Sequence, residues 1–97
     1  MLLKIKWTPR AKKDYLKIID YLHEKWTIKE VNSFVIKTNY TLALISKNPN
    51  LFPQSKKKEI HKCVLSKQTS LYYRIRNSEL ELIAFWDNRR NPKKLKL

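Results

Sequence analysis

The sequence contains no glycine and a single cysteine, Cys63, among its 97 residues. One cysteine excludes an internal disulfide and a four-ligand zinc cluster of the usual kind. Without glycine the chain lacks the tight strand-to-helix turn that presents a nucleophilic serine in many hydrolases, so Ser66 and Ser70 are not expected to be nucleophiles. Repeats and low-complexity linkers are also missing, which predicts one compact domain over residues 1–97.

Long apolar runs are missing too. No stretch approaches the roughly 18 apolar residues that cross a bilayer. The N-terminal stretch MLLKIKWTPR reaches its first lysine after two leucines, which argues against a signal peptide. We therefore expect no membrane partner, and the single cysteine favours a cytoplasmic, reducing location.

Acidic residues are scarce relative to basic ones. The chain has 8 Asp and Glu against 22 Lys and Arg, a net charge of +14. Such an excess attracts polyanions, because their binding releases condensed counterions. Nucleic acid, the ribosome, an acidic protein and an anionic membrane surface all fit this charge, as does a plain gain in solubility, and the charge alone does not choose among them.

The first quarter of the chain reads as a strand followed by a helix. Residues 2–7 place lysines and apolar side chains on opposite faces, as a strand with one buried face does. Thr8 and Pro9 then predict a helix start, because threonine caps free N–H groups and proline suits the first helical position. The apolar residues that repeat every three or four positions along this helix are Ala11, Tyr15, Ile18, Ile19, Leu22 and Trp26.

A second helix is predicted from about Ile28 to Ser46. Its apolar stripe consists of Ile28, Val31, Val35, Thr38, Leu42 and Ile45, widened by Phe34 and Leu44. The link between the two helices is short, so they should pack as an antiparallel hairpin. The stretch NPNLFP, residues 48–53, ends this helix and forms a proline-bounded loop.

The C-terminal half reads as three strands, at residues 59–66, 69–76 and 79–86, with turns at Lys67-Gln68 and Asn77-Ser78. Alternation places Leu71, Tyr73 and Ile75 on one face of the middle strand, and Leu80, Leu82, Ala84 and Trp86 on one face of the last. The order β-α-α-β-β-β predicts an α+β fold, with a four-stranded antiparallel sheet and the N-terminal helical hairpin packed on one face.

Metal chemistry has little support in the sequence. A site would need His23, His61 and Cys63 to converge with a carboxylate. His61 and Cys63 share one strand face, but His23 lies on the first predicted helix. We expect no metal and no other cofactor.

Basic side chains gather on the predicted polar face of the sheet and at its C-terminal end. Lysine and arginine bind phosphodiesters, tyrosine stacks on bases, and such groups can also transfer protons in metal-independent RNA cleavage. Arg74 and Arg76 have an alternative role as cross-strand partners of Glu79 and Glu81. The catalytic candidates are His61, Lys62, Tyr72, Arg74, Arg89 and Arg90, and the target-binding candidates are Lys56, Lys57, Lys58, Arg76, Lys93 and Lys94.

Four stretches in succession carry a family resemblance: KIKWTPRAKKDYLKIIDYL, ALISKNPNLFP, SLYYRIR and LIAFWDNRRNPKKL. Together they resemble, over essentially the whole chain, the RelE/ParE superfamily of toxins from bacterial type II toxin–antitoxin systems. The resemblance implies a growth-inhibitory toxin that a cognate antitoxin neutralises, a partner expected to be small, acidic and encoded next door. RelE-type members cut mRNA on the ribosome, whereas ParE-type members block DNA gyrase.

The resemblance carries over to individual residues unevenly. His61 and Lys62 stand in the basic strand, and Arg89 or Arg90 matches the arginine after the last strand. Ser70 stands near the position where RelE-type nucleases keep an arginine, and the tail PKKLKL has no terminal tyrosine or histidine. These departures favour ParE-like target binding, with DNA gyrase as the candidate target. The alternative is a RelE-like, ribosome-dependent mRNA endoribonuclease.

Overall fold

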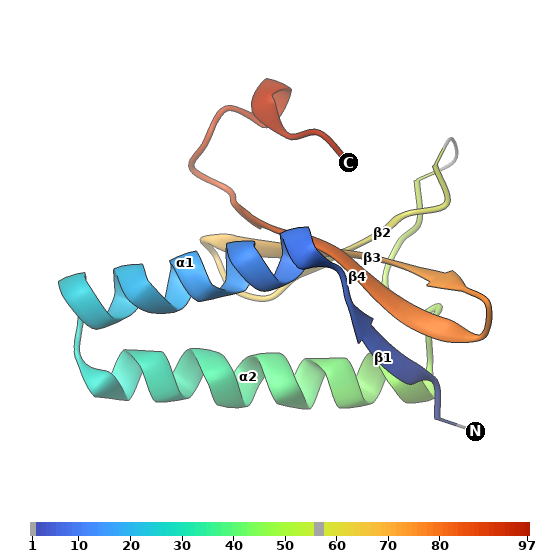
Figure 1. Ribbon diagram of the computed structural model, residues 1–97, viewed down its shortest axis with the longest axis horizontal. Helices are drawn as coiled ribbons and strands as arrows, with labels where there is room; N and C mark the ends of the chain where they lie inside the picture. The colour runs from blue at the N-terminus through green and yellow to red at the C-terminus, as the bar shows by residue number, and fades with distance from the viewer. Residues whose placement is uncertain (1, 56–57) are drawn as a thin grey trace.

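The computed structural model describes residues 2–55 and 58–97, so the predicted target-binding residues Lys56 and Lys57 lie outside the described part. The chain has the predicted α+β order of elements (Figure 1). These elements are β1 (Lys4–Trp7), α1 (Pro9–Lys25), α2 (Ile28–Lys47), β2 (His61–Val64), β3 (Thr69–Arg76), β4 (Glu79–Asp87) and a short 3-10 helix, η1 (Pro92–Lys94).

Both helices begin at side-chain caps. The Thr8 hydroxyl oxygen accepts a hydrogen bond from the Ala11 N–H at 3.1 Å and donates one to the Leu82 carbonyl at 2.7 Å. Thr8 therefore starts α1 and fixes that start to β4. At α2 the Glu30 carboxylate accepts hydrogen bonds from the backbone N–H and the hydroxyl of Thr27, which completes a capping box.

The helical hairpin extends beyond the sheet at its closed end (Figure 1). Trp26 and Ile28, which the apolar stripes include, are 54% and 62% exposed because no strand lies beneath them. Closer to the sheet the same stripes supply Ala11, Leu42 and Ile45 to the core. The apolar stripes thus identify the helices, but they do not show which part of each helix packs on the sheet.

The sheet is mixed, with strand order β1-β4-β3-β2. The pairs β2–β3 and β3–β4 are antiparallel as predicted, but β1 pairs with β4 in parallel. The expectation of a purely antiparallel sheet is wrong in this respect. The alternation of polar and apolar residues is the same in parallel and antiparallel strands, so it does not predict strand direction. Here the direction depends on where the helices and the loop after α2 bring the chain back to the sheet.

A bulge in β4 changes which of its side chains face the core. Tyr72 lies opposite Ala84 but Tyr73 lies opposite Leu82, so Ile83 is an extra residue. Beyond this point the alternation is reversed. The predicted common face of Leu80, Leu82, Ala84 and Trp86 is therefore wrong after Leu82, and Phe85 joins the core instead.

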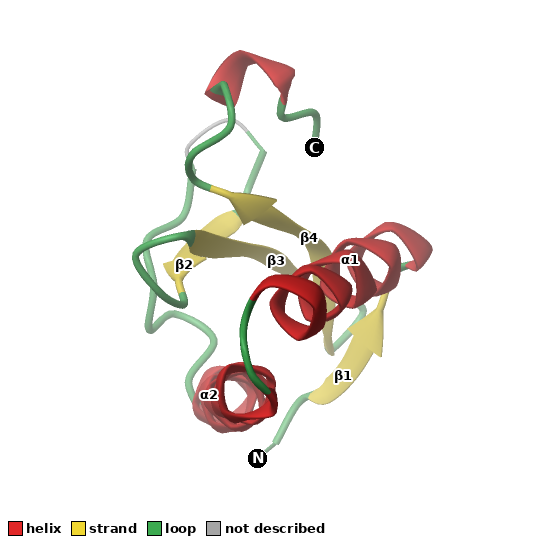
Figure 2. Ribbon diagram, turned by 90° about the vertical axis from the view of Figure 1, so that its left-hand side faces the viewer, coloured by secondary structure: helices red, strands yellow, loops and turns green. Residues whose placement is uncertain are grey.

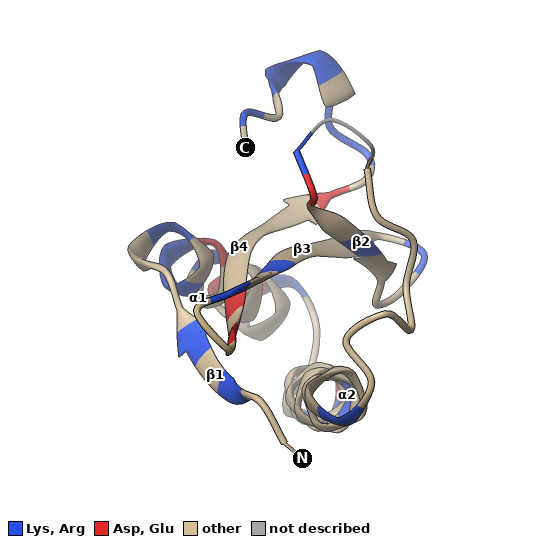
Figure 3. Ribbon diagram, turned by 90° about the vertical axis from the view of Figure 1, so that its right-hand side faces the viewer, with Lys and Arg blue, Asp and Glu red and all other residues tan. Residues whose placement is uncertain are grey.

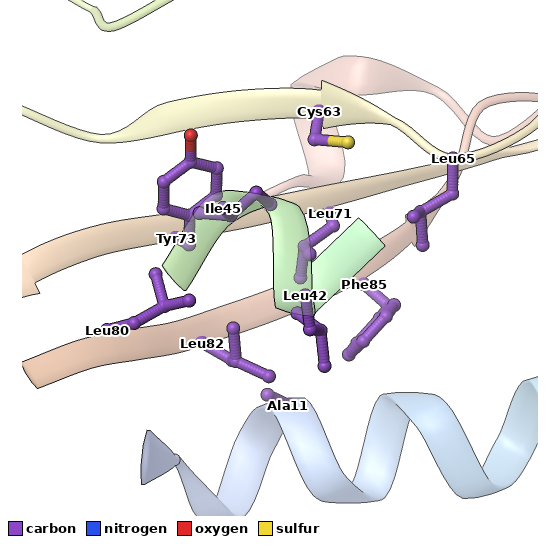
Figure 4. Close-up of a cluster of buried hydrophobic side chains, with 10 residues drawn as sticks. All are labelled: Ala11, Leu42, Ile45, Cys63, Leu65, Leu71, Tyr73, Leu80, Leu82 and Phe85. Atoms are coloured by element: carbon purple, nitrogen blue, oxygen red, sulfur yellow. The ribbon is translucent and has the colours of Figure 1, made fainter. Parts of the chain in front are cut away.

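The core lies between the helices and the concave face of the sheet (Figures 2 and 4). Its buried members are Ala11, Leu42, Ile45, Cys63, Leu65, Leu71, Tyr73, Leu80, Leu82 and Phe85. Trp7 stacks on Phe85 with ring centroids 5.6 Å apart, and Tyr15 packs against both rings. Because Phe85 is packed in this cluster, the end of β4 two residues later, at Asp87, has a fixed position.

The turns and the C-terminus complete the fold: the turn at Asn77-Ser78 is confirmed, whereas the predicted strand 59–66 is shorter than expected. Glu59 has a φ of 55°, which interrupts the predicted strand 59–66 and leaves β2 at His61–Val64. Asn77 and Ser78 have φ values of 52° and 61°, so they form the tight β3–β4 turn without glycine. After β4 the chain folds back over the outer face of the sheet (Figures 1 and 2), where Ala84 and Trp86 are buried.

Candidate functional site

Residues 87–90, which follow the last core residues of β4, form what we call the arginine corner. Asn88 anchors it to the turn between β2 and β3. The Asn88 N–H donates to the Gln68 carbonyl at 2.7 Å, and its side-chain oxygen accepts a hydrogen bond from the Ser70 hydroxyl at 2.7 Å. Ser70 is fully buried. The residue at the expected arginine position therefore holds the Asn88 side chain and does not face solvent.

Arg89 is held by its neighbour two positions earlier. Its Nε and Nη2 donate to the two Asp87 carboxylate oxygens at 3.0 and 2.8 Å, and its backbone N–H donates to the same carboxylate at 2.9 Å. The guanidinium also lies over the Tyr21 ring, 5.7 Å from its centroid. These contacts fix the orientation of a side chain that remains 54% exposed.

The electrostatics of this pair follow from its geometry. The hydrogen bonds from Arg89 lower the pKa of the Asp87 carboxyl, and the Asp87 carboxylate in turn raises the pKa of the Arg89 guanidinium. Both groups are therefore charged at neutral pH. Since the pair is exposed to water, it orients the arginine more than it stabilises the fold.

Arg90 is oriented by an aromatic ring instead. Its guanidinium carbon lies 4.4 Å from the centroid of the Trp86 ring, a cation–π distance. Trp86 is nearly buried. No carboxylate lies within ion-pair distance of Arg90 in the described part of the chain. Arg90 thus presents a charge that no acidic side chain neutralises.

The corner borders a groove of about 430 Å³ between α1, α2 and the end of β4. Its apolar lining comes from Ile18, Leu22, Phe34 and Phe85. Its charged lining comes from Asp14, Lys17, Glu30, Lys37, Asp87, Arg89 and Arg90. Asp14 is already engaged, because it accepts the Phe85 N–H at 3.2 Å and pairs with Arg10 at 3.6 Å. The remaining surface combines an apolar floor with a mainly basic rim.

His61, a catalytic candidate, lies on the core side of the sheet. It is 4% exposed, its Nδ1 lies 2.8 Å from the Phe52 carbonyl oxygen, and its ring stacks on Tyr73 at 4.8 Å. Tyr73 in turn donates its hydroxyl to the Pro49 carbonyl at 3.1 Å. Both rings therefore fix the loop after α2, a structural role.

Arg74 and Arg76, which we call the hairpin-end cations, lie near the β3–β4 turn. The Arg74 Nε donates to the Glu81 carboxylate at 2.7 Å, and the Glu81 side chain is only 11% exposed. Arg76 lies opposite Glu79 in the strand register. Arg74 thus has the predicted cross-strand role, and Arg76 lies opposite one of the predicted partners.

Among the residues that the structure describes, the predicted basic side chains do not come together in one site. Thr69 pairs with Asp87 and Arg76 pairs with Glu79, so the arginine corner and the hairpin-end cations lie at opposite ends of the β3–β4 hairpin. Lys62 and Tyr72 are cross-strand neighbours between them. Lys58, Lys93 and Lys94 are exposed. Figure 3 shows the basic residues distributed over several elements.

Sequence reasoning missed the side chains that hold the corner in place. Tyr21 and Trp86 lie against the two arginines, and Ser70 binds Asn88. Only the Asp87–Arg89 pair had a local signal, because the two residues are separated by one position. The other contacts join residues far apart in the chain, and a sequence pattern does not carry them.

Two classes of site have no support in the described part of the chain. No three side chains among its histidines, cysteines and carboxylates converge as metal ligands do. Within residues 2–55 and 58–97, no helix is long and apolar enough to cross a membrane.

Comparison with known proteins identifies relatives of this architecture. The profile of the family described as ParE toxin of type II toxin-antitoxin system, parDE, matches residues 5–92. A search of curated protein sequences found no match.

Solved structures agree with the fold. A chain of the chromosomal ParDE TA system from P. aeruginosa superposes with a TM-score of 0.73 at 16% identity, covering 89% of this chain and 96% of that one. A conserved hypothetical protein from Helicobacter pylori has a TM-score of 0.60 at 18% identity, covering 92% and 98%. A copper-bound mutant toxin from Helicobacter pylori has a TM-score of 0.60 at 22% identity, covering 91% and 97%.

Proposed function

Because the chain belongs to the ParE toxin family of type II toxin–antitoxin systems, we propose that it inhibits growth by binding a target, with DNA gyrase as the candidate, and that a cognate antitoxin neutralises it. The P. aeruginosa ParDE match, which covers 89% of this chain, supports an antitoxin partner. The proposed target is intracellular, so the proposal includes a cytoplasmic location.

The observation that carries target binding is that two catalytic candidates, and the serine near the expected arginine position, are engaged in contacts within the fold. His61 is buried on the core side, Arg74 is bound to Glu81, and Ser70 holds Asn88. General acid–base cleavage needs a proton donor and a phosphate ligand within reach of the same bond. These three positions do not supply such a pair, whereas the arginine corner presents two oriented guanidinium groups to a macromolecular surface.

Arginine suits a protein target in this setting. Its planar fork binds carboxylates in two places at once, and side chains that are already oriented lose less conformational freedom on binding. Asp87 orients Arg89, and Trp86 orients Arg90. We propose that both arginines contact the target directly.

The charge and the exposed apolar side chains of the chain indicate what kind of antitoxin would bind it. The charge of +14 is compatible with an acidic protein partner. Ile36 and Tyr40, one helical turn apart on α2, are 68% and 65% exposed, and an amphipathic segment would cover them. A pull-down in rising salt separates the two contributions: binding that falls with salt is mainly electrostatic, and salt-insensitive binding is mainly apolar.

Ribosome-dependent mRNA cleavage is the second candidate. Lys62 and Tyr72 lie opposite each other in the β2–β3 pair, and Tyr72 lies on the outer face of the sheet. In such a pair the tyrosine can stack on a base while the lysine contacts the phosphate. This pair is the observation that keeps RNA as a possible target.

Expression of the chain in growing cells separates the two candidates. The proposed function predicts that plasmids lose negative supercoiling while mRNA stays intact. Cleavage of mRNA between codons, seen only in the presence of ribosomes, would contradict gyrase as the target and favour the second candidate. Coexpression with an acidic protein encoded next door should restore growth.

A further inference from the structure

The strand β2 forms one edge of the sheet, and only part of that edge is covered. The Lys62 N–H donates to the Pro53 carbonyl at 3.0 Å, and the Ser55 N–H donates to the Ile60 carbonyl at 2.8 Å. The segment before β2 therefore covers the beginning of the strand. Among its described residues, the bridge to β2 joins Gln54 with His61, and no strand continues from there along Val64.

The open part of the edge follows from strand geometry. In an antiparallel pair, alternate residues point their backbone groups to the same side. Since the Lys62 N–H points away from β3, the N–H and the carbonyl of Val64 do so as well. Within residues 2–55 and 58–97 neither group has a backbone partner outside β3. Val64 is also 58% exposed, so neither its backbone nor its side chain is shielded.

A groove of about 630 Å³ lies next to this open edge, on the outer face of the sheet. Its large apolar side chains are Phe52, Ile60, Val64, Tyr72 and Leu97. The charged side chains among its described lining are Lys58 and Lys62, and no carboxylate side chain accompanies them there. The groove therefore combines an apolar floor with positive charge beside unpaired backbone groups.

We propose that this edge and groove bind an extended acidic peptide segment, which adds a strand beside β2. Its backbone would pair with the free groups of Val64. Alternate side chains of an added strand face the same side of the sheet, so one set of alternate residues faces the groove; apolar members of that set contact its floor, and acidic members of the same set meet Lys58 and Lys62. The paired N–H and carbonyl select a peptide over a nucleic acid, and the lysines select an acidic sequence.

The inference rests on the proposed function for the biological source of this segment, the antitoxin. It goes beyond that function because it places one part of the partner on the β2 edge, away from both the α2 surface and the arginine corner. The binding test does not require the antitoxin.

The probe is a short synthetic peptide, blocked at both ends and labelled for fluorescence anisotropy, in which every second residue is leucine or glutamate and the residues between them are threonine, so that leucines and glutamates lie on the same face. Val64→Pro removes the outward N–H, and an edge strand tolerates proline at such a position. Val64→Thr keeps the N–H and the branched shape, so it is the matched control. We expect Val64→Pro to weaken binding about tenfold or more. Val64→Thr should change binding by less than about threefold.

Modified peptides test the same contact without altering the protein. N-methylation of every second residue removes the N–H groups from one edge of the peptide. One of the two alternating sets should abolish binding to the wild-type chain, and the other set should leave it unchanged. Lys62→Glu should weaken binding of the unmodified peptide and reduce the loss of binding that added salt causes, because a repulsive charge replaces an attractive one.

Several results would overturn the inference. These are no binding of the unmodified peptide, equal binding to Val64→Pro, or equal effects of the two methylation sets. Binding of a single-stranded RNA that Lys62→Glu weakens and Val64→Pro does not would assign the groove to nucleic acid instead. None of these results touches the proposed function, which the supercoiling of plasmids in cells tests separately.

Discussion

The two ends of the β3–β4 hairpin carry similar basic residues in different surroundings. At the turn, Arg74 binds Glu81, whose side chain is 11% exposed. At the arginine corner, Arg89 binds Asp87, whose side chain is 33% exposed, and Arg90 lies on Trp86. A carboxylate that is nearly buried needs its cation for stability, whereas an exposed carboxylate or a ring mainly sets the direction of its arginine.

From this difference we predict that Arg74 is structural and that Arg89 and Arg90 are functional. Removal of Arg74 would leave a buried charge without a partner. Removal of Arg89 would leave a carboxylate that water can solvate, and removal of Arg90 would leave no charge without a partner. We therefore expect substitutions at the arginine corner to lower toxicity, and the substitution of Arg74 at the other end to lower stability.

The largest expected effect is the loss of toxicity in the double variant Arg89→Ala with Arg90→Ala. Both proposed contacts with the target disappear, and such central arginines often dominate a protein interface. We expect toxicity to fall about a hundredfold or more in a titrated induction assay, while the circular dichroism spectrum stays unchanged.

The matched control for that variant is Lys12→Ala with Lys13→Ala. These exposed lysines of α1 carry the same total charge and do not line the groove beside the corner. A double arginine variant that remains fully toxic, or a control that loses as much toxicity, would show that the corner is not the contact surface.

The reverse pattern is expected for Arg74→Ala at the other end of the hairpin. The Glu81 carboxylate loses its partner, so the free energy of unfolding should fall by roughly 1–3 kcal/mol in urea titrations. Toxicity should persist at temperatures where the variant is folded. Arg76→Ala is the control and should change stability by less than about 0.5 kcal/mol. Loss of toxicity without loss of stability in Arg74→Ala would make it a functional residue.

Alkaline pH should weaken the fold between these two ends. Burial raises the pKa of the Cys63 thiol from 9.0 to about 11 and that of the Tyr73 hydroxyl from 10.0 to about 12. Because both folded pKa values are raised, their contribution is complete below pH 9 and is lost as the pH rises through about 11 and 12. The free energy of unfolding should fall by roughly 1–3 kcal/mol for each group over this range.

Variants identify the groups responsible for this loss. Cys63→Ala and Tyr73→Phe should each flatten the dependence of stability on pH in this range, although both also lose packing or a hydrogen bond. A profile that stays as steep in both variants would contradict the assignment.

The smallest expected effect is that of Asp87→Asn. The change removes the carboxylate that orients Arg89 but leaves both arginines in place. Toxicity should fall about threefold to tenfold, well short of the double arginine variant. In the wild-type chain the Asp87 pKa is lowered, so its contribution to stability is present at neutral pH and is lost only as the pH falls below 3.8. An effect on toxicity as large as that of the double variant would make Asp87 a contact residue itself.

Much of the fold could be predicted because its signals are local. Thr8 and Pro9 start a helix by themselves, and alternation sets β3 at Thr69–Arg76. The parallel pairing of β1 with β4 and the bulge at Ile83 could not be predicted, because they depend on how distant segments meet.

The candidate site divides in the same way. The sequence shows the arginines of the corner and the absence of arginine at position 70. It does not show that Ser70 binds Asn88, that Tyr21 lies under Arg89, or that His61 is buried. Each of these facts requires a tertiary contact.

The most direct test of the central claim, target binding through the arginine corner, uses purified components. Plasmid supercoiling by DNA gyrase is measured while the wild-type chain or the double arginine variant is added. The account predicts that the wild-type chain blocks supercoiling and that the variant does not. Unimpaired gyrase, together with ribosome-dependent cleavage of mRNA by the same preparation, would contradict it.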